Sequence, residues 1–359
     1  MKRLLLPGIV ALTLFTTGCS EEFELAAPYK DVTLVYAMLD ANLDTNYVRI
    51  QKAFMDPEKS AIDMAKVSDS NFYAVGLLDV QVKEMDGKTL KSTTPLTRVS
   101  MPKEEGDFSS SPNYAYRLIK DLNPVYTYRL VIRNIATGDV DSSETAIITN
   151  DTLTVNDFYI PALGSPNTTP GQPPFPPYEL GFSRTTSNSF KYRLPVRVPP
   201  PAKVLQGIIR FYYWEVNNTT GSETPHSLDF PFASAVIENG SSADLEVHNS
   251  AFYDFFKENL SVVPANVKRY LHYCDIFVYA GSNDYYEYLK LTGGPINGLT
   301  SNEIKPIYSN IQGTDAIGLF TTRGVRIGRG VEIEPITFDS LALNPLTQPT
   351  GIQPERWYK

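Results

Sequence analysis

Apolar and polar positions alternate along much of the first half of the chain, which predicts strands. Residues 31–51 predict two strands separated by a mostly polar turn over 40–46, and residues 75–84 predict a third strand that ends in an Asp-Gly hairpin. The clearest strand is 125–133, where one face carries Tyr126, Tyr128, Leu130 and Ile132. Such alternation is expected for a sheet that buries one face.

The second half predicts strands mixed with short helices. Residues 208–216 form an aromatic strand, and residues 270–280 predict another. Ser250 is a candidate cap for a short helix with Phe252, Phe255, Phe256 and Leu260 on its apolar side. The run Ser282-Asn283-Asp284 offers caps for a second helix through Tyr285, Tyr286, Tyr288 and Leu289.

A short motif before the clearest strand indicates which kind of sheet the first half forms. Leu122, Pro124 and Tyr128 make an L-x-P-x-x-x-Y pattern that resembles the tyrosine-corner region of fibronectin type III and immunoglobulin-like domains. The resemblance implies that the Tyr128 hydroxyl ties its strand to the preceding loop. The alternative is that Tyr128 is a ligand platform.

Proline positions divide the chain into regions. Seven prolines between 161 and 178 remove too many amide donors for a helix or for the hydrogen-bond ladder of a sheet, so this stretch is a linker or a long surface loop.

From the predicted strands and this division we expect a mainly β protein. The expected regions are a signal peptide at 1–18, a lipidated acidic tether at 19–27, an immunoglobulin-like sandwich at 28–150, a Pro-rich linker with entry strands at 151–206, a β-rich domain with short helices at 207–345, and a tail at 346–359.

The first residues have the order of a secretory signal that ends in a lipobox. Lys2 and Arg3 precede a largely apolar run over 4–15, and Thr16-Thr17-Gly18-Cys19 follows. The apolar run is shorter than the roughly 20 residues that a spanning helix needs. We expect cleavage before Cys19 and attachment to the membrane through lipid on that cysteine. The alternative is an ordinary cleaved signal with an incidental cysteine.

Acidic residues follow the predicted anchor directly. Ser20, Glu21, Glu22 and Glu24 resemble the surface-export signal of Bacteroidota lipoproteins, which implies an outer-membrane protein that faces the exterior. The alternative is a solvated linker.

The net charge restricts the kinds of partner that we expect, and the cysteine content restricts the disulfides that can form. The formal net charge is −8, and loss of Lys2 and Arg3 with the leader makes the mature chain more negative, so nucleic acid is not an expected partner. Cys274 is the one cysteine besides Cys19, so the mature chain forms no internal disulfide.

No motif for catalysis, metal binding or cofactor binding occurs in the sequence. His226, His248 and His272 lack the short paired spacing of metal ligands, and no glycine-rich cofactor loop is present. His272 and Cys274 lie two apart on a predicted strand and could form a thiolate pair, although an inert buried cysteine is favoured. A hydrolase stays open as the third alternative, because a carboxylate pair depends on distance across a cleft.

Three further groups of residues are candidates for contacts or modification. Trp214, Tyr285, Tyr286 and Tyr288 could recognise a glycan or peptide ligand, or could fill the core. Arg323, Arg326 and Arg329 are interpreted as solvent-facing residues of an edge strand, with contact to an acidic partner or anionic glycan as the alternative. Asp151-Thr152-Leu153 and Asp339-Ser340-Leu341 resemble a short bacterial O-glycosylation motif, with Thr152 and Ser340 as acceptors.

Taken together, these features resemble a known family. The lipidated leader, early sandwich, proline-rich joint, Tyr-rich helix and late segments 310–313 and 316–320 are similar to the Bacteroidota lipoprotein family of unknown function four-two-four-nine. The resemblance implies an envelope role, often in company with TonB-dependent receptors. We expect a non-catalytic accessory or ligand-binding subunit, with a structural or adhesive surface protein as the alternative.

Overall fold

The computed structural model describes residues 32–53, 63, 66–67, 71–102, 112–149, 153–155, 179–182, 191–198, 200–238, 242–292, 308–313 and 315–355. The predictions for the signal peptide, Cys19, the acidic tether and Thr152 lie outside these residues. The described part is mainly β with a few short helices, as predicted. No described helix is both long enough and apolar enough to cross a membrane.

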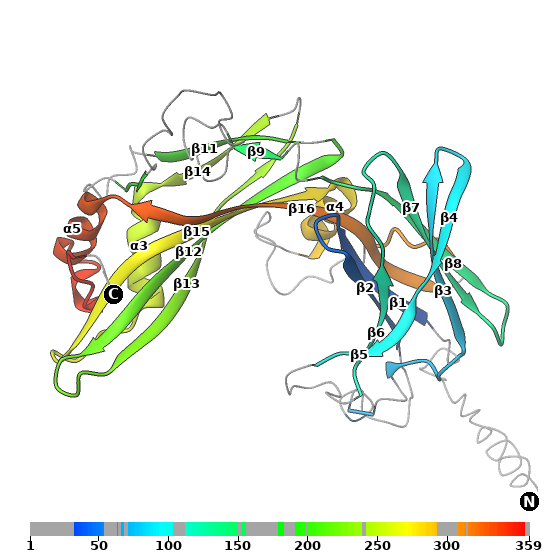
Figure 1. The fold of residues 1–359 in the computed structure, drawn as a ribbon, viewed down its shortest axis with the longest axis horizontal. Helices are drawn as coiled ribbons and strands as arrows, with labels where there is room; N and C mark the ends of the chain where they lie inside the picture. The colour runs from blue at the N-terminus through cyan, green and yellow to red at the C-terminus, as the bar shows by residue number, and fades with distance from the viewer. Residues whose placement is uncertain are drawn as a thin grey trace, which may run out of the picture.

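Two lobes share one long sheet (Figure 1). Its strand order is β13-β12-β15-β16-β1-β2-β6-β5, and β10 pairs with the end of β16. The bounds are β1 Val32–Asp40, β2 Thr45–Ala53, β5 Thr97–Ser100, β6 Tyr114–Ile119, β10 Glu179–Leu180, β12 Ala202–Asn217, β13 Glu223–Val236, β15 Val267–Ser282 and β16 Ala316–Ile333.

The N-terminal lobe is a sandwich, as the sequence predicts. The sheet portion formed by β1, β2, β6 and β5 packs on a second sheet of order β4-β3-β7-β8. The bounds of the second sheet are β3 Leu78–Asp86, β4 Thr89–Pro95, β7 Thr127–Asn134 and β8 Val140–Ala146. Gly87, at φ +57°, makes the predicted hairpin turn between β3 and β4.

The predicted tyrosine corner is confirmed. Tyr128 is fully buried, and its hydroxyl oxygen accepts a hydrogen bond from the Asn123 amide at 2.7 Å. The same hydroxyl donates to Glu84 Oε1 at 3.3 Å. Tyr128 therefore holds the loop before β7 against β3, which supports the structural interpretation rather than a ligand platform.

The N-terminal sandwich takes one strand from the far end of the chain. Residues 316–323 of β16 pair in parallel with β1, although the sequence places them in the second domain. Gly318, at φ +139°, lies against β1 so closely that a Cβ atom there would be 1.9 Å from Val35 O. The side chain of Asn310 accepts from the Phe320 amide and donates to the Phe320 carbonyl, which fixes the start of β16.

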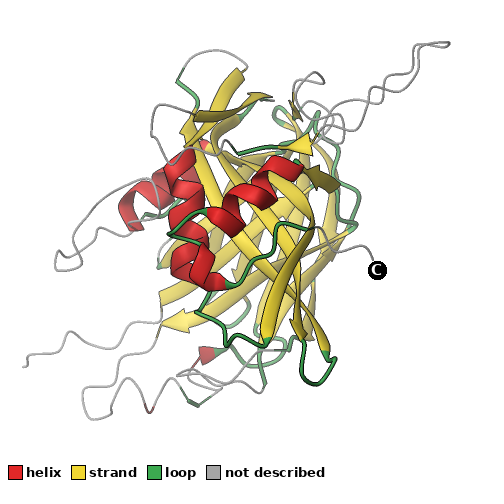
Figure 2. Ribbon diagram, turned by 90° about the vertical axis from the view of Figure 1, so that its left-hand side faces the viewer, coloured by secondary structure: helices red, strands yellow, loops and turns green. Residues whose placement is uncertain are grey.

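The C-terminal lobe packs a short sheet and helices on the other half of the long sheet. The short sheet has the order β14-β11-β9, with β9 Thr154–Val155, β11 Lys191–Arg197 and β14 Ser242–His248. Helices α3 (Asn249–Asn259) and α5 (Pro335–Leu343) contribute to the same aromatic core, in which the Phe182 and Phe252 rings stack at 3.8 Å. A 3₁₀ helix, η2 (Gln348–Thr350), follows α5. Figure 2 views the molecule from this end, with helices in front of the crossing strands.

Of the two predicted helix starts, one differs from the structure and one agrees with it. Ser250 lies inside α3, which begins at Asn249 after His248 and has no side-chain cap. The second helix, α4 (Asn283–Thr292), begins where predicted, and Ser282 Oγ accepts from the Tyr285 amide at 3.3 Å.

The arginine-rich segment begins where β16 leaves β1. Arg323 still lies between β1 and β15, so the prediction of an edge strand is wrong for this residue. Residues 324–328 pair with β15 alone among the described strands, as predicted for an edge. Arg323 pairs with Asp40 and Arg329 pairs with Asp275, which gives both buried aspartates a cationic partner.

Candidate functional site

A pocket of about 310 Å³ lies where α4 meets β12, β13, β15, β16 and β1. This is the junction between the lobes, where β16 leaves β1 and pairs with β15. The apolar and aromatic lining is Met38, Val204, Leu205, Ile208, Tyr279, Ala280, Gly281, Tyr285 and Leu289. The polar lining is Gln206, Ser234 and Arg323.

The register of β12 and β15 explains why side chains of the long sheet reach this pocket. Gln206 is opposite Tyr279 and Ile208 is opposite Phe277, and all four are only partly buried. Their neighbours Ile209 and Val278 are fully buried in the aromatic core on the other face. Side chains alternate between the two faces of a strand, so the same strands that build the core also present a second, half-covered face.

Helix α4 closes one side of the pocket. Tyr285 and Leu289 are four residues apart, so they lie on the same face of the helix. Gly281 permits the helix to approach β15, because a Cβ atom there would be 2.4 Å from Tyr285 Cδ1. Burial and the neighbouring Tyr288 raise the pKa of Tyr285, while Arg323 opposes that increase. The Tyr285 hydroxyl therefore remains protonated and able to donate at neutral pH.

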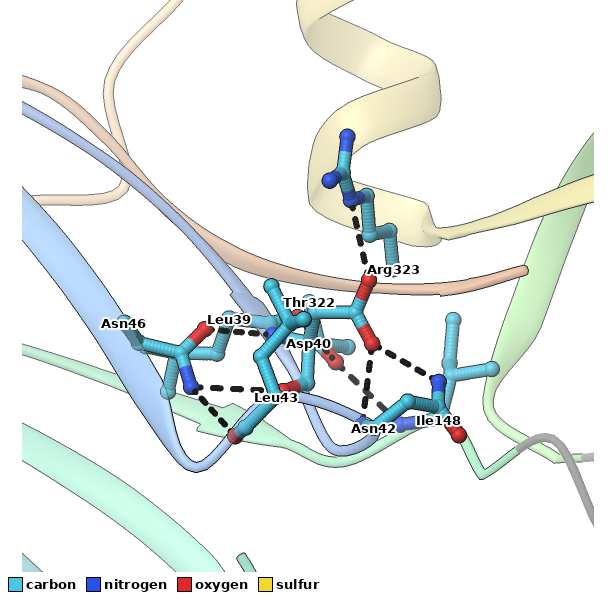
Figure 3. A network of polar contacts seen from close by, with 8 residues as sticks. All are labelled: Leu39, Asp40, Asn42, Leu43, Asn46, Ile148, Thr322 and Arg323. Carbon is cyan, nitrogen blue, oxygen red and sulfur yellow. Dashed lines mark hydrogen bonds and ion pairs between the residues drawn. The ribbon is translucent and has the colours of Figure 1, made fainter. Parts of the chain in front are cut away.

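Arg323 is the charged residue in the lining, and a buried network holds it in place. Its Nε donates to Asp40 Oδ2 at 3.3 Å, and the Asp40 side chain is only 4 % exposed. The other carboxylate oxygen, Oδ1, accepts from the Asn42 amide at 3.0 Å and from Asn42 Nδ2 at 2.7 Å. Figure 3 shows the outer end of the guanidinium directed away from Asp40, toward the α4 ribbon.

The turn that carries Asp40 is itself tied to the lobe junction. Asn46 Oδ1 accepts from the Asp40 amide at 2.8 Å, and Asn46 Nδ2 donates to the carbonyls of Asp40 and Leu43. Thr322, next to Arg323, accepts from the Ile148 amide through Oγ1 and donates to the Leu39 carbonyl (Figure 3). These bonds position Arg323 before any ligand arrives.

The predicted recognition residues do not form one surface. Tyr285 lines the pocket, and Tyr286 and Tyr288 are half-buried on the same helix outside the lining. Trp214 is also half-buried, but it lies near the other end of β12, opposite Pro225 and Tyr270.

The pocket also contains four residues that the sequence did not indicate as functional, namely Met38, Gln206, Ile208 and Leu289. They come from three elements that are distant along the chain, namely β1, β12 and α4. No local pattern distinguishes them from ordinary strand or helix residues.

The other chemical candidates occupy ordinary structural positions. Cys274 is fully buried, and burial raises the pKa of its thiol far above the usual value, as expected for an inert cysteine. Ser340 is also buried, and its Oγ donates to the Ile336 carbonyl at 2.6 Å. The prediction of O-glycosylation at Ser340 is therefore wrong for the folded chain, because the acceptor hydroxyl is inaccessible. Within the described ranges, no group of three or more His, Cys, Asp or Glu residues is placed to hold a metal ion.

Comparison with known proteins finds only solved structures with low sequence identity and low TM-scores. No protein-family model matches the chain, and no curated protein matches it. The calcium binding domain CBD12 of CALX1.1 is 10 % identical, with 82 % of this chain and 98 % of that chain covered and a TM-score of 0.17. CBD12 from CALX1.2 is 12 % identical, with 81 % and 98 % covered and a TM-score of 0.16.

Proposed function

We propose that this chain is an outer-membrane lipoprotein, displayed on the exterior, that acts as a non-catalytic binding subunit of an envelope assembly. The pocket at the lobe junction is the observation that carries the binding role. Mostly apolar walls with a few fixed polar groups are the usual composition of a ligand site, and about 310 Å³ is at the lower end of the usual size range. The leader and Cys19 support the membrane anchor.

The partner that we propose is a TonB-dependent outer-membrane receptor. The resemblance to the lipoprotein family supports this choice, and the acidic tether at 19–27 supports display on the exterior. The net negative charge of the chain favours a protein or small-molecule partner over nucleic acid.

The anchor is tested by fractionating cells that express Cys19→Ala. We expect the variant to leave the membrane fraction, because its membrane affinity would come from acyl chains alone. A matched control is Cys274→Ala, which removes the buried cysteine and leaves Cys19 intact. Retention of Cys19→Ala in the membrane contradicts the anchor.

The binding role is tested by a pull-down from native membranes in mild detergent. A stoichiometric β-barrel receptor in the eluate supports the accessory role. Self-association or binding to host matrix without a receptor favours the structural or adhesive alternative instead.

A further inference from the structure

We propose that the pocket at the lobe junction binds a small amphiphile with an apolar body and one carboxylate, which Arg323 holds. This inference rests on the proposed function, because it names the ligand class of the same binding protein.

The apolar part of the ligand is assigned by the pocket walls. Met38 from β1, Ile208 from β12 and Leu289 from α4 approach the space from three elements. Tyr279 and Tyr285 add ring surface. A hydrocarbon or aromatic body replaces water against these walls, which is the main source of affinity at sites of this composition.

The charged end of the ligand is assigned by the geometry of Arg323. Asp40 contacts Nε, and no hydrogen bond to the two terminal nitrogens is found among the described residues. These nitrogens lie on the side of the guanidinium that points toward α4 (Figure 3). A guanidinium presents two parallel N–H donors that match the two oxygens of a carboxylate.

Asp40 determines how much negative charge the site accepts. Its buried carboxylate already offsets part of the Arg323 charge. Among the described residues, Arg323 is the only cation in the pocket lining, with no second cation to compensate a dianion. A singly charged carboxylate therefore fits this site better than a doubly charged phosphate. The amide of Gln206 and the hydroxyl of Ser234 add neutral polar contacts.

The preference is tested by calorimetric titration of three probes with the same apolar body, namely 4-phenylbutyrate, 4-phenylbutanol and 4-phenylbutylamine. The protein is the full chain with Cys19→Ala, so that no detergent micelles compete for the probes. We expect the carboxylate to bind roughly tenfold or more tightly than the alcohol, and the amine most weakly.

Arg323→Gln is expected to remove the carboxylate preference and to leave the affinity for the alcohol unchanged. The matched control is Arg329→Gln, six residues further along β16, which also removes an arginine paired with a buried aspartate but lies outside the pocket. This control is expected to leave all three affinities unchanged. Equal affinities in the wild-type protein, or a carboxylate preference that persists in Arg323→Gln, would overturn the proposal.

A second variant tests the pocket if Arg323→Gln fails to fold. Leu289→Trp is expected to fill the space and to lower the affinity of every probe at least tenfold. Leu343→Trp, at a leucine that is 74 % exposed in α5, is the matched control and is expected to bind normally. Unchanged binding by a folded Leu289→Trp protein refutes the site.

The two proposals fail in different assays. Receptor recovery with no carboxylate preference rejects the ligand class and keeps the proposed function. A carboxylate preference that depends on Arg323, with no receptor in the pull-down, supports the ligand class and counts against the receptor.

Discussion

Replacing Tyr128 by Phe removes one hydroxyl and tests whether the tyrosine corner stabilises the N-terminal lobe. The hydroxyl accepts from the Asn123 amide at 2.7 Å and donates to Glu84 Oε1 at 3.3 Å, with a longer contact to the Asn123 carbonyl at 3.5 Å. After the change, the Asn123 amide has lost its acceptor. The Glu84 carboxylate still accepts from Ser92 and pairs with Lys120 at 2.7 Å. This bond is part-buried, although Asn123 itself is exposed, and leaving such a donor without its acceptor costs about 1–3 kcal/mol.

We therefore expect Tyr128→Phe to lower the free energy of unfolding by about 2 kcal/mol, measured by urea titration with far-UV circular dichroism. Tyr126→Phe, two residues earlier in the chain, is the matched control. The Tyr126 ring is half-buried beside Lys91, and no hydrogen bond of its hydroxyl is found among the described residues. The control should change stability by less than about 0.5 kcal/mol. Equal effects of the two substitutions would refute the assigned role of the hydroxyl.

The remaining predictions concern acid stability, backbone geometry and export. Burial alone would raise the pKa of Glu84, but the hydrogen bonds from Lys120 and Ser92 outweigh burial and lower this pKa in the folded protein. The ionised Glu84 side chain therefore stabilises the fold above its unfolded-state pKa, and this stabilisation is lost as the pH falls through its folded-state pKa. Glu84→Gln should therefore flatten the loss of melting temperature below about pH 5. Gly318→Ala should destabilise by roughly 3 kcal/mol, because Cβ would meet Val35 O, whereas Gly138→Ala, also at positive φ but in open space, should cost about 1 kcal/mol in the same urea assay. Alanine at the three tether glutamates (Glu21, Glu22, Glu24) should keep lipidation and abolish cleavage by protease added to intact cells, and unchanged cleavage would show that the tether is only a linker.

Local features of the fold could be predicted from the sequence. The β1–β2 pair, the β3–β4 hairpin, the Tyr128 corner and the start of α4 each depend on residues that are close along the chain. Alternation, an Asp-Gly turn and a capping serine report such short-range structure directly.

The partners of β16 and the pocket could not be predicted in the same way. The alternation in 316–333 is compatible with an edge or an internal strand, since it does not identify which strands lie beside it. Arg323 was recognised as unusual, but its partner Asp40 is 283 residues away. The lining depends on the lobe junction, which exists only after β16 has joined both halves of the long sheet.

The shared strand β16 also sets the order in which the chain can fold. The parallel β1–β16 ladder joins residues 33–40 to residues 316–323, so its formation closes a loop that contains most of the chain. Contacts of such long sequence separation form slowly, because the entropy of loop closure must be overcome first. In the export that we propose, the N-terminus emerges first, yet its sandwich lacks β16 until almost all of the chain has followed. We therefore expect the lobe nearest the predicted anchor to be the last to be completed, with the edge of β1 exposed to periplasmic chaperones until then.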